Sequence, residues 1–470
     1  MLFGQYGIIR RSSTNETAVS ETAVSFLSGV VMRFYDRTRE IDKLREIERR
    51  SHEVAQFTVV TGRRRVGKSS LILKACERCR FAYLFVERKS EKDLCEGFAA
   101  ELESKLGIPF YGPPSRFADL FKAMMKFSVD HPITVVIDEF QEFLKINKAV
   151  FSEIQHQWDV YHADAKINLI VSGSVYTLMQ RIFLTRKASL YGRATSFFKI
   201  QPFCIDVLKQ ILADHSPHYD NEDLLALWTF TGGVAKYVAL MMDAGAITRR
   251  QMIEKIVSEE SLLIDEGRMI LAEEFDKEYG FYFSVLSAIA CGRNTRAEIS
   301  QALGRDCGGY LTRLERDYAI IEQIRPIYAK NSAKGAHYRI HDWFFSFWFR
   351  FVFKYSYLLQ IRGYDKLREI IERDYPVFSG FALEDYFHQK FAESGKWTRI
   401  GSWWDRKGEN ELDILAENEL DGTHAVCEVK RDKSRIDLAK VRDKLSAFRE
   451  ATGKWRTVRP EFLALSLEDM

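Results

Sequence analysis

The stretch from Gly62 to Ser69, Gly-Arg-Arg-Arg-Val-Gly-Lys-Ser, constrains the fold of this 470-residue chain more than any other feature. It fits the phosphate-binding loop pattern G-x-x-x-x-G-K-[S/T]. The β-branched run 57–61 before it predicts a buried strand, and the run 71–75 after it predicts a helix. Such a loop places backbone N–H groups at a helix N-terminus, where the helix dipole favours anions. The sequence therefore predicts a nucleoside triphosphate site on an α/β fold.

Two later strands are expected to complete this site. The apolar run that begins at Ile133 ends in Asp138 and Glu139, as a buried parallel strand followed by two acids. Asp138 is expected to hold the Mg²⁺ shell, and Glu139 to orient and deprotonate the attacking water. Ser172 and Ser174 close a third strand where a γ-phosphate sensor would lie, although a simple Ser/Gly turn has the same composition.

The chemistry of the loop itself depends on two side chains. Lys68 would reach the β- and γ-phosphates, and the Ser69 hydroxyl would ligate Mg²⁺. An acidic pair after the second strand is typical of enzymes that hydrolyse the nucleotide. The residues expected to bind nucleotide and ion are Gly62, Arg63, Arg64, Arg65, Val66, Gly67, Lys68, Ser69, Ser70, Asp138, Ser172 and Ser174.

The composition places few limits on function. The chain is 46% hydrophobic and 29% charged, which is ordinary for a globular protein. Its net charge of +3 argues neither for nor against nucleic-acid binding. No stretch reaches the ~20 apolar residues of a membrane span. Seven scattered cysteines indicate reduced thiols in a cytoplasmic protein. Cys76 and Cys79 form a lone C-x-x-C, which is more typical of buried small residues than of zinc ligands.

Residues 1–31 differ from the rest of the chain. They contain a tandem repeat, Glu-Thr-Ala-Val-Ser at 16–20 and 21–25, and little periodic hydrophobic pattern. We expect a poorly structured extension here. One hypothesis is that translation starts at Met32, and intact-mass measurement of the native protein would test it, since a species beginning at Met1 would refute it.

Residues 276–341 have the pattern of a winged helix. An apolar helix is expected over 282–290, and Thr295 is expected to cap a second helix with Glu298 three residues on. A third helix over 308–319 and a two-stranded wing over 320–340 would follow, and these are the surfaces that such folds lay on DNA. Nine Lys/Arg against five Asp/Glu over 293–339 is a mild excess. A lid that senses the nucleotide, or a platform for protein, therefore stays open.

The C-terminal part holds a second group of chemical residues. Asp413 lies on one predicted strand, and Glu428 and Lys430 share one face of the next, because strand side chains alternate. Glu384 lies upstream in a predicted helix. This is the arrangement of restriction-endonuclease-like nucleases. Asp413 and Glu428 would hold Mg²⁺, Lys430 would stabilise the phosphorane charge or position water, and Glu384 would complete the metal shell.

Two observations qualify this reading. An acid and an E-x-K on a hairpin also arise by chance. Residues 428–459 hold eleven Lys/Arg and five Asp/Glu, which fits either contact with nucleic acid or a solvated basic helix.

Together these motifs resemble the archaeal-type ATPases, a branch of the AAA+/STAND P-loop proteins. The resemblance covers residues 34 to about 275, and it implies that the nucleotide is ATP and that Arg193 is an arginine finger, often supplied by a neighbouring subunit. This family often ends in a nuclease-related domain, which residues 375–440 resemble. This chain has Ala235 where relatives usually carry proline. The matching segments are 34–37 with Glu40 and Leu44, 62–68, 138–141, 172–174, 191–193 and 231–233.

We therefore expect a multidomain α/β protein. Its parts would be a P-loop parallel sheet with helices on both faces and a helical lid (32–275), a winged helix (276–341), an aromatic helical linker (342–374) and a small α/β restriction-endonuclease-like domain (375–470). The leading hypothesis is a cytoplasmic ATPase that uses ATP and Mg²⁺ to act on DNA, without a membrane, as a homo-oligomer with Arg193 acting in trans. The alternative is a regulatory switch for protein partners with a catalytically silent C-terminal scaffold.

Overall fold

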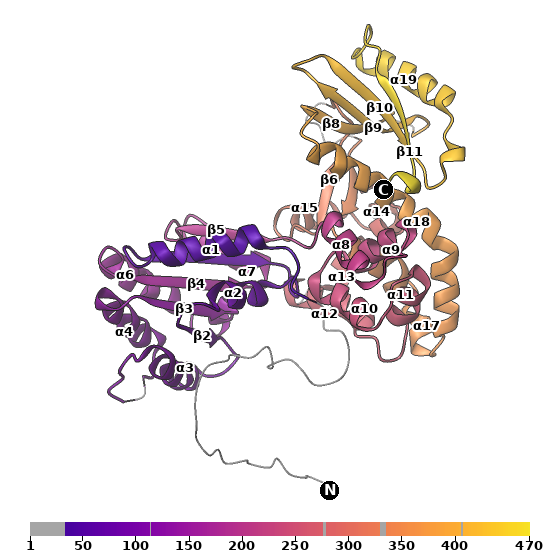
Figure 1. Ribbon diagram of the computed structural model, residues 1–470. Helices are drawn as coiled ribbons and strands as arrows, with labels where there is room; N and C mark the ends of the chain where they lie inside the picture. Colours follow the sequence, from indigo (N-terminus) through magenta and orange to yellow (C-terminus); the bar gives the residue numbers. More distant parts are fainter. Residues whose placement is uncertain (1–32, 113, 276–278, 330–334, 406–407) are drawn as a thin grey trace.

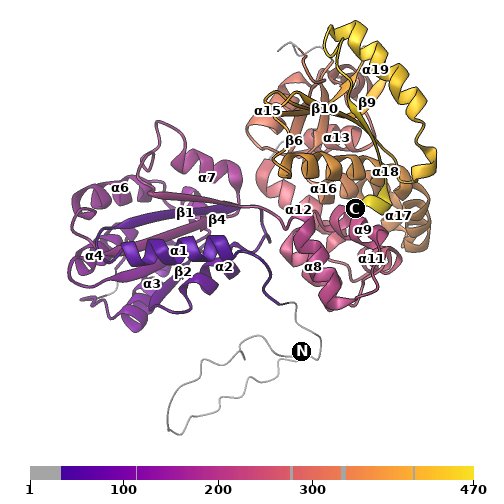
Figure 2. The same cartoon turned by 45° about the horizontal axis from the view of Figure 1, so that its top comes forward.

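The computed structural model describes residues 33–112, 114–275, 279–329, 335–405 and 408–470. The expected N-terminal extension and the proposed start at Met32 lie outside these residues. The described chain forms two bodies (Figures 1 and 2). One, coloured indigo to magenta, is built on a five-stranded sheet. The other contains the remaining helices and two smaller sheets.

The five strands of the first body form a wholly parallel sheet of order β2-β3-β4-β1-β5. Strands β1, β3 and β4 are buried along their whole length, which is why their sequences are continuous apolar and β-branched runs. The strands are β1 (Gln56–Gly62), β2 (Phe81–Phe85), β3 (Ile133–Asp138), β4 (Ile167–Gly173) and β5 (Ser196–Ile200).

Helices cover both faces of this sheet, so the predicted flanked parallel sheet is confirmed. Apolar side chains of α1 and α2 pack on one face, and those of α3, α4, α6 and α7 pack on the other. These elements are α1 (Thr38–Arg50), α2 (Lys68–Cys76), α3 (Glu91–Leu106), α4 (Phe117–Asp130), η1 (Phe140–Glu142), α5 (Phe143–Ile146), α6 (Val150–Tyr161) and α7 (Tyr176–Phe183).

The second body begins with helices of the expected lid and then the expected three-helix and hairpin segment. Thr295 caps α14 through a capping box with Glu298, as the sequence predicted. The elements are α8 (Ile205–His215), α9 (Asn221–Thr231), α10 (Ala235–Asp243), α11 (Arg249–Ile256), α12 (Leu263–Phe275), α13 (Tyr279–Ala290), α14 (Arg296–Leu303), α15 (Gly308–Arg316), β6 (Ile321–Ile324) and β7 (His337–Ile340).

An aromatic segment and one long helix connect this region to the C-terminal sheet. α18 runs without interruption through Pro376, so the boundary expected between residues 374 and 375 lies inside a helix. The sheet has the order β11-β10-β9-β8, with β10 and β11 parallel and the other pairs antiparallel. These elements are α16 (Trp343–Phe347), η3 (Trp348–Phe353), α17 (Ser356–Gln360), α18 (Tyr364–Glu393), β8 (Arg399–Trp404), β9 (Glu411–Asn418), β10 (Thr423–Val429), η4 (Lys433–Arg435), α19 (Leu438–Thr452), β11 (Glu461–Leu465) and η5 (Leu467–Asp469).

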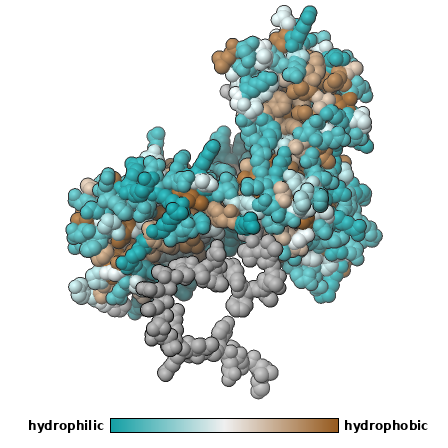
Figure 3. All heavy atoms as spheres, in the orientation of Figure 1, coloured by the Kyte–Doolittle hydropathy of each residue, from teal (hydrophilic) through white to brown (hydrophobic). Residues whose placement is uncertain are grey.

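A single apolar core runs through the second body. It joins α8–α16, η3, α18 and one face of the C-terminal sheet, while α19 covers the other face of that sheet. The surface seen in Figure 3 is mainly hydrophilic, with apolar residues gathered over part of the C-terminal domain. Among the described helices, none combines the length and apolar character needed to cross a bilayer.

Candidate nucleotide site and a second acidic site

The predicted phosphate loop connects the carboxyl end of β1 to the first turn of α2. Gly67 precedes α2 with φ of 99°, a conformation that L-residues rarely adopt. A Cβ on Gly62 would lie 2.6 Å from the carbonyl oxygen of Ile200 on β5. The glycines of the motif are therefore required by the backbone path, which leaves the N–H groups of the loop and of α2 facing one anion site.

Lys68 is buried within this loop. Its Nζ donates to the carbonyl oxygens of Gly62 at 2.9 Å and Arg63 at 3.1 Å. Burial lowers the pKa of Lys68 to about 8, although Glu139 and Asp138 oppose the shift. A triphosphate in the loop would replace the two carbonyl groups as partner and favour the charged ammonium.

Asp138 is the acceptor at the centre of the site. Ser69 donates to Asp138 at 2.7 Å, Ser172 and Tyr83 also donate to its carboxylate, and the backbone N–H of Glu139 donates at 2.9 Å. Burial alone would raise the pKa of Asp138, but the hydrogen bonds outweigh it and hold the pKa below its usual value. Asp138 is therefore an anion that lies against the Ser69 hydroxyl.

Glu139 occupies a left-handed backbone position, with φ of 54°. Its carboxylate accepts from the hydroxyl of Ser174 at 2.8 Å and from the amide of Gln141. Ser172 and Ser174 thus hydrogen-bond the two acids, and their expected contact with a γ-phosphate stays a prediction. Tyr83 was not predicted at this site, because its contact with Asp138 depends on β2 lying next to β3.

The three loop arginines point away from the phosphate position. Arg63 pairs with Asp342 and lies 4.3 Å from the ring centroid of Phe345. Arg64 pairs with Glu273 at 2.8 Å, and Arg65 with Glu266 at 2.5 Å, both on α12. Their backbone groups still form the loop. Their side chains contact the second body instead of the nucleotide site. Ser70 is exposed and follows Ser69 in the first turn of α2.

The donor set fits a nucleotide with Mg²⁺. The Ser69 hydroxyl and the Asp138 carboxylate are hard oxygen ligands 2.7 Å apart, and the buried Lys68 ammonium lies in the same loop. When bound, Mg²⁺ would neutralise charge on the β- and γ-phosphates. Lys68 would bind the phosphates, Glu139 would accept the proton of the attacking water, and Ser174 would keep that carboxylate oriented. A parallel sheet with this loop and this acidic pair defines a P-loop ATPase.

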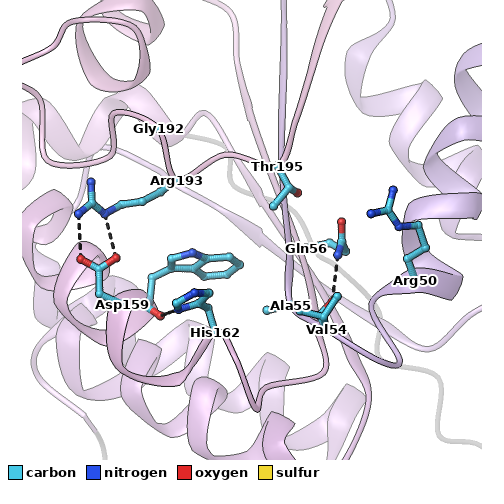
Figure 4. A pocket seen from close by; sticks show the side chains of 10 residues that line it. Arg50, Val54, Ala55, Gln56, Asp159, His162, Gly192, Arg193 and Thr195 are labelled. Carbon is cyan, nitrogen blue, oxygen red and sulfur yellow. Dashed lines mark hydrogen bonds and ion pairs between the residues drawn. The ribbon is translucent and has the colours of Figure 1, made fainter.

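Arg193 lies at the opposite end of the sheet. It pairs with Asp159 through two bonds of 2.8 and 3.0 Å, beside a cavity of about 570 Å³ near Gln56 and Thr195 (Figure 4). These residues lie at the amino ends of β1 and β5. The length of β1, ~20 Å at about 3.3 Å per residue, separates them from the loop. Arg193 therefore lies too far from the nucleotide site of its own chain to contact it.

A second acidic site lies in the C-terminal sheet. The structure brings together all four residues predicted there. Lys430 Nζ is 3.1 Å from Asp413 and 3.2 Å from Glu428, and the N–H of Val429 donates to Asp413 at 2.8 Å. Glu384 of α18 adjoins them and interacts electrostatically with Asp413.

Two more residues belong to this site and were missed from the sequence. Glu411 precedes Asp413 by two residues on β9, and this alternation was a signal that would have placed both on one face. Lys444 of α19 contacts both oxygens of Glu428, at 3.0 and 3.2 Å. No local sequence pattern predicts Lys444 at this site, because its position depends on how α19 packs across the sheet.

Charge at this site is only partly balanced. Burial raises the pKa of Glu384 well above its usual value and also raises the pKa values of Glu411 and Asp413, and neighbouring carboxylates add to each shift. Against burial, Asp413 and Glu428 raise the pKa of Lys430. Across the described ranges, no three acidic, His or Cys side chains converge closely enough to form a ready metal cage. Lys430 and Lys444 occupy the space beside the carboxylates.

The hairpin expected to form the wing is partly covered. The N–H of Ile327 donates to the carbonyl of Ser402 on β8 at 2.8 Å, and the indole of Trp404 donates to the carbonyl of Gly335 at 3.1 Å. His337 stacks on Trp404 with ring centroids 4.3 Å apart. The segment between β6 and β7 thus contacts the C-terminal sheet, and α15 remains as the more exposed surface.

Comparisons with known proteins agree with this class. Residues 34–241 match the family described as an ATPase domain predominantly from Archaea, and residues 348–442 match a family of archaeal and bacterial proteins of unknown function. An uncharacterised protein of Methanocaldococcus jannaschii is 30% identical over 422 residues, which are 87% of this chain and 90% of that protein. A Walker-type ATPase of Pyrococcus abyssi shares the fold, with a TM-score of 0.51 and 17% identity over 69% of this chain and 99% of that one. The chain therefore belongs to the archaeal ATPase family.

Proposed function

We propose that this ATPase couples ATP hydrolysis to movement of its second body on DNA, and that the C-terminal sheet is a metal-dependent nuclease. The observation that carries the coupling is the set of loop arginine contacts. Arg63, Arg64 and Arg65 belong to the phosphate loop, yet their side chains bind acids of α12 and Asp342. A phosphate that reshapes the loop backbone would therefore change the contacts that hold the second body.

The acidic site supports the nuclease part of the proposal. Four carboxyl groups, Glu384, Glu411, Asp413 and Glu428, face two ammonium groups, Lys430 and Lys444, so ionisation of all four would leave two negative charges in excess. Mutual repulsion contributes to the raised pKa values, and a divalent cation would relieve it. Mg²⁺ held there would polarise a phosphodiester and acidify water. With the carboxylates bound to Mg²⁺, Lys430 would be free to contact the phosphodiester and stabilise its developing negative charge.

The test is a plasmid nicking assay in Mg²⁺ or Mn²⁺, with and without ATP. We expect wild type to nick the plasmid, and Glu428→Ala and Lys430→Ala to lose at least a hundredfold in rate. Glu419→Ala is the matched control, because Glu419 is exposed on the same domain and pairs with Arg399, outside the acidic site. Titration with Mn²⁺ followed by calorimetry gives a second readout, in which Glu428→Ala should lose one binding site.

A regulatory switch with a silent C-terminal scaffold is the second candidate. The direct contacts of Lys430 and Lys444 with the carboxylates favour it, since they satisfy the acids without metal. The covered hairpin also favours an internal docking role for that segment. Absence of both cleavage and Mn²⁺ binding in wild type would overturn the nuclease and leave the switch.

A further inference from the structure

A basic groove lies on the C-terminal domain, next to the acidic site but lined by different residues. It has a volume of about 400 Å³ and lies between α19 and the segment 456–460 that leads into β11. Its lining contains no acidic residue and four arginines, Arg442, Arg449, Arg456 and Arg459. We call these residues the arginine groove.

The charges of the arginine groove are not neutralised by the protein. Within the residues that the structure describes, no ion pair involves any of the four, whereas Arg399 and Arg431 of the same domain both pair with glutamates. Arg442 lies over the ring of Phe462, 5.3 Å from its centroid. Arg449 donates to the carbonyl of Val458 at 2.6 Å, while its Nε is buried without a partner.

The spacing of these arginines suits a chain of phosphates. Arg442 and Arg449 are seven residues apart on α19, which is two turns and ~10 Å. Two guanidinium groups at that distance can each contact a different phosphate, because a nucleic-acid backbone carries charge along its whole length. Arg456 and Arg459 lie on the facing wall, and guanidinium groups bind phosphate in a bidentate manner. The charges of an acidic peptide are less regularly spaced than the phosphates of a nucleic acid, so a nucleic acid is the better fit.

The groove also lies close to the acidic site. Phe462 of the groove pairs with Val426, two residues before Glu428 on β10. One strand spacing of about 4.8 Å and two residue rises of about 3.3 Å separate the backbones by roughly 8 Å. Lys444, which contacts Glu428, is two residues from Arg442 on α19.

We propose that the arginine groove binds the phosphodiester backbone of the nucleic acid that the acidic site acts on. This rests on the proposed action on DNA, but not on cleavage. The test is fluorescence anisotropy of a labelled DNA duplex in EDTA, over a series of salt concentrations. The variant carries Arg442→Gln, Arg456→Gln and Arg459→Gln, and Arg449 is kept because it holds the 458 carbonyl.

We expect the triple variant to bind roughly tenfold more weakly at low salt, with the slope of log affinity against log salt reduced by about 2 to 3. The control carries Arg362→Gln, Lys366→Gln and Arg373→Gln, which removes the same charge from exposed cations that pair with acids. Arg459→Gln alone, at an exposed position, gives a smaller loss without risk to folding.

The outcomes separate this proposal from the proposed function. Unchanged affinity and slope in the triple variant, or an equal loss in the control, would overturn the groove assignment while wild-type binding still supported action on DNA. No binding by wild type would overturn action on DNA itself. Equal competition by polyglutamate would show an unspecific anion site and overturn the nucleic-acid assignment.

Discussion

The carboxylate of Glu139 is fixed by Ser174 and Gln141 at the end of β3, where attacking water would meet the γ-phosphate. We predict that Glu139→Gln binds ATP within a few-fold of wild type but loses about 10²–10⁴ in kcat, the range of a general base.

Lys68→Ala should lose nucleotide binding. Calorimetry with ATP and Mg²⁺ and steady-state phosphate release check both, with Lys74→Ala as the control. Normal ATP turnover by Glu139→Gln would contradict the assignment of Glu139 as the general base.

Glu274 of α12 gives a pH prediction. It accepts from the N–H of Tyr176 and the hydroxyl of Thr177, and burial raises its pKa from 4.5 to about 7. Because the folded state holds the proton more tightly, its stabilising contribution is complete below pH ~4.5 and is lost as the pH rises through about 7. Glu274→Gln should therefore show a smaller fall in Tm from pH 5 to 8 than wild type. Thermal melts followed by circular dichroism test this, and exposed Glu369→Gln should behave like wild type.

At the scale of elements, the phosphate loop and α12 are joined by two ion pairs of different burial. Arg64 and Glu273 are both about 40% exposed, whereas the Glu266 side chain is 2% exposed. Double-mutant cycles to alanine, measured by urea unfolding, should give about 0.2–1 kcal/mol for Arg64–Glu273. The Arg65–Glu266 pair should give about 1–3 kcal/mol, because Glu266 is desolvated. Equal coupling energies for the two pairs would contradict this account.

Secondary-structure elements and local motifs could be predicted from the sequence, but the long-range contacts of their side chains could not. The runs ending at Asp138 and Gly173, and the cap at Thr295, follow from local pattern, and the structure contains them. Arg63, Arg64 and Arg65 were expected to bind nucleotide as part of the loop, and nothing in the sequence indicated that their side chains contact the second body. Such contacts join residues about 200 positions apart, which no periodicity encodes. For the same reason Lys444 was not foreseen at the acidic site.

At the scale of the whole molecule, Arg193 lies too far from its own phosphate loop to act there. If it acts across a subunit interface, Arg193→Ala should lower kcat by at least a hundredfold, given the 10³–10⁵ supplied by arginine fingers in other P-loop enzymes. Mixing Arg193→Ala with Glu139→Gln should restore part of the activity, because one mixed interface holds both intact groups. Phosphate release at constant total protein tests this. No recovery, in a sample shown by light scattering to be oligomeric, would exclude the shared site.

In the part of the chain that the structure describes, residues 201–204 lead from the last strand of the first body, β5, to the first helix of the second, α8. Arg37 braces this segment by donating to the carbonyl of Gln201 and lying 5.4 Å from the ring centroid of Phe203. Lengthening the segment with a few glycines would leave both hydrophobic cores intact. Since the Arg63–Asp342 and Arg65–Glu266 contacts would remain as a second link between the bodies, such a protein would show how much of the proposed coupling depends on the length of this covalent connection.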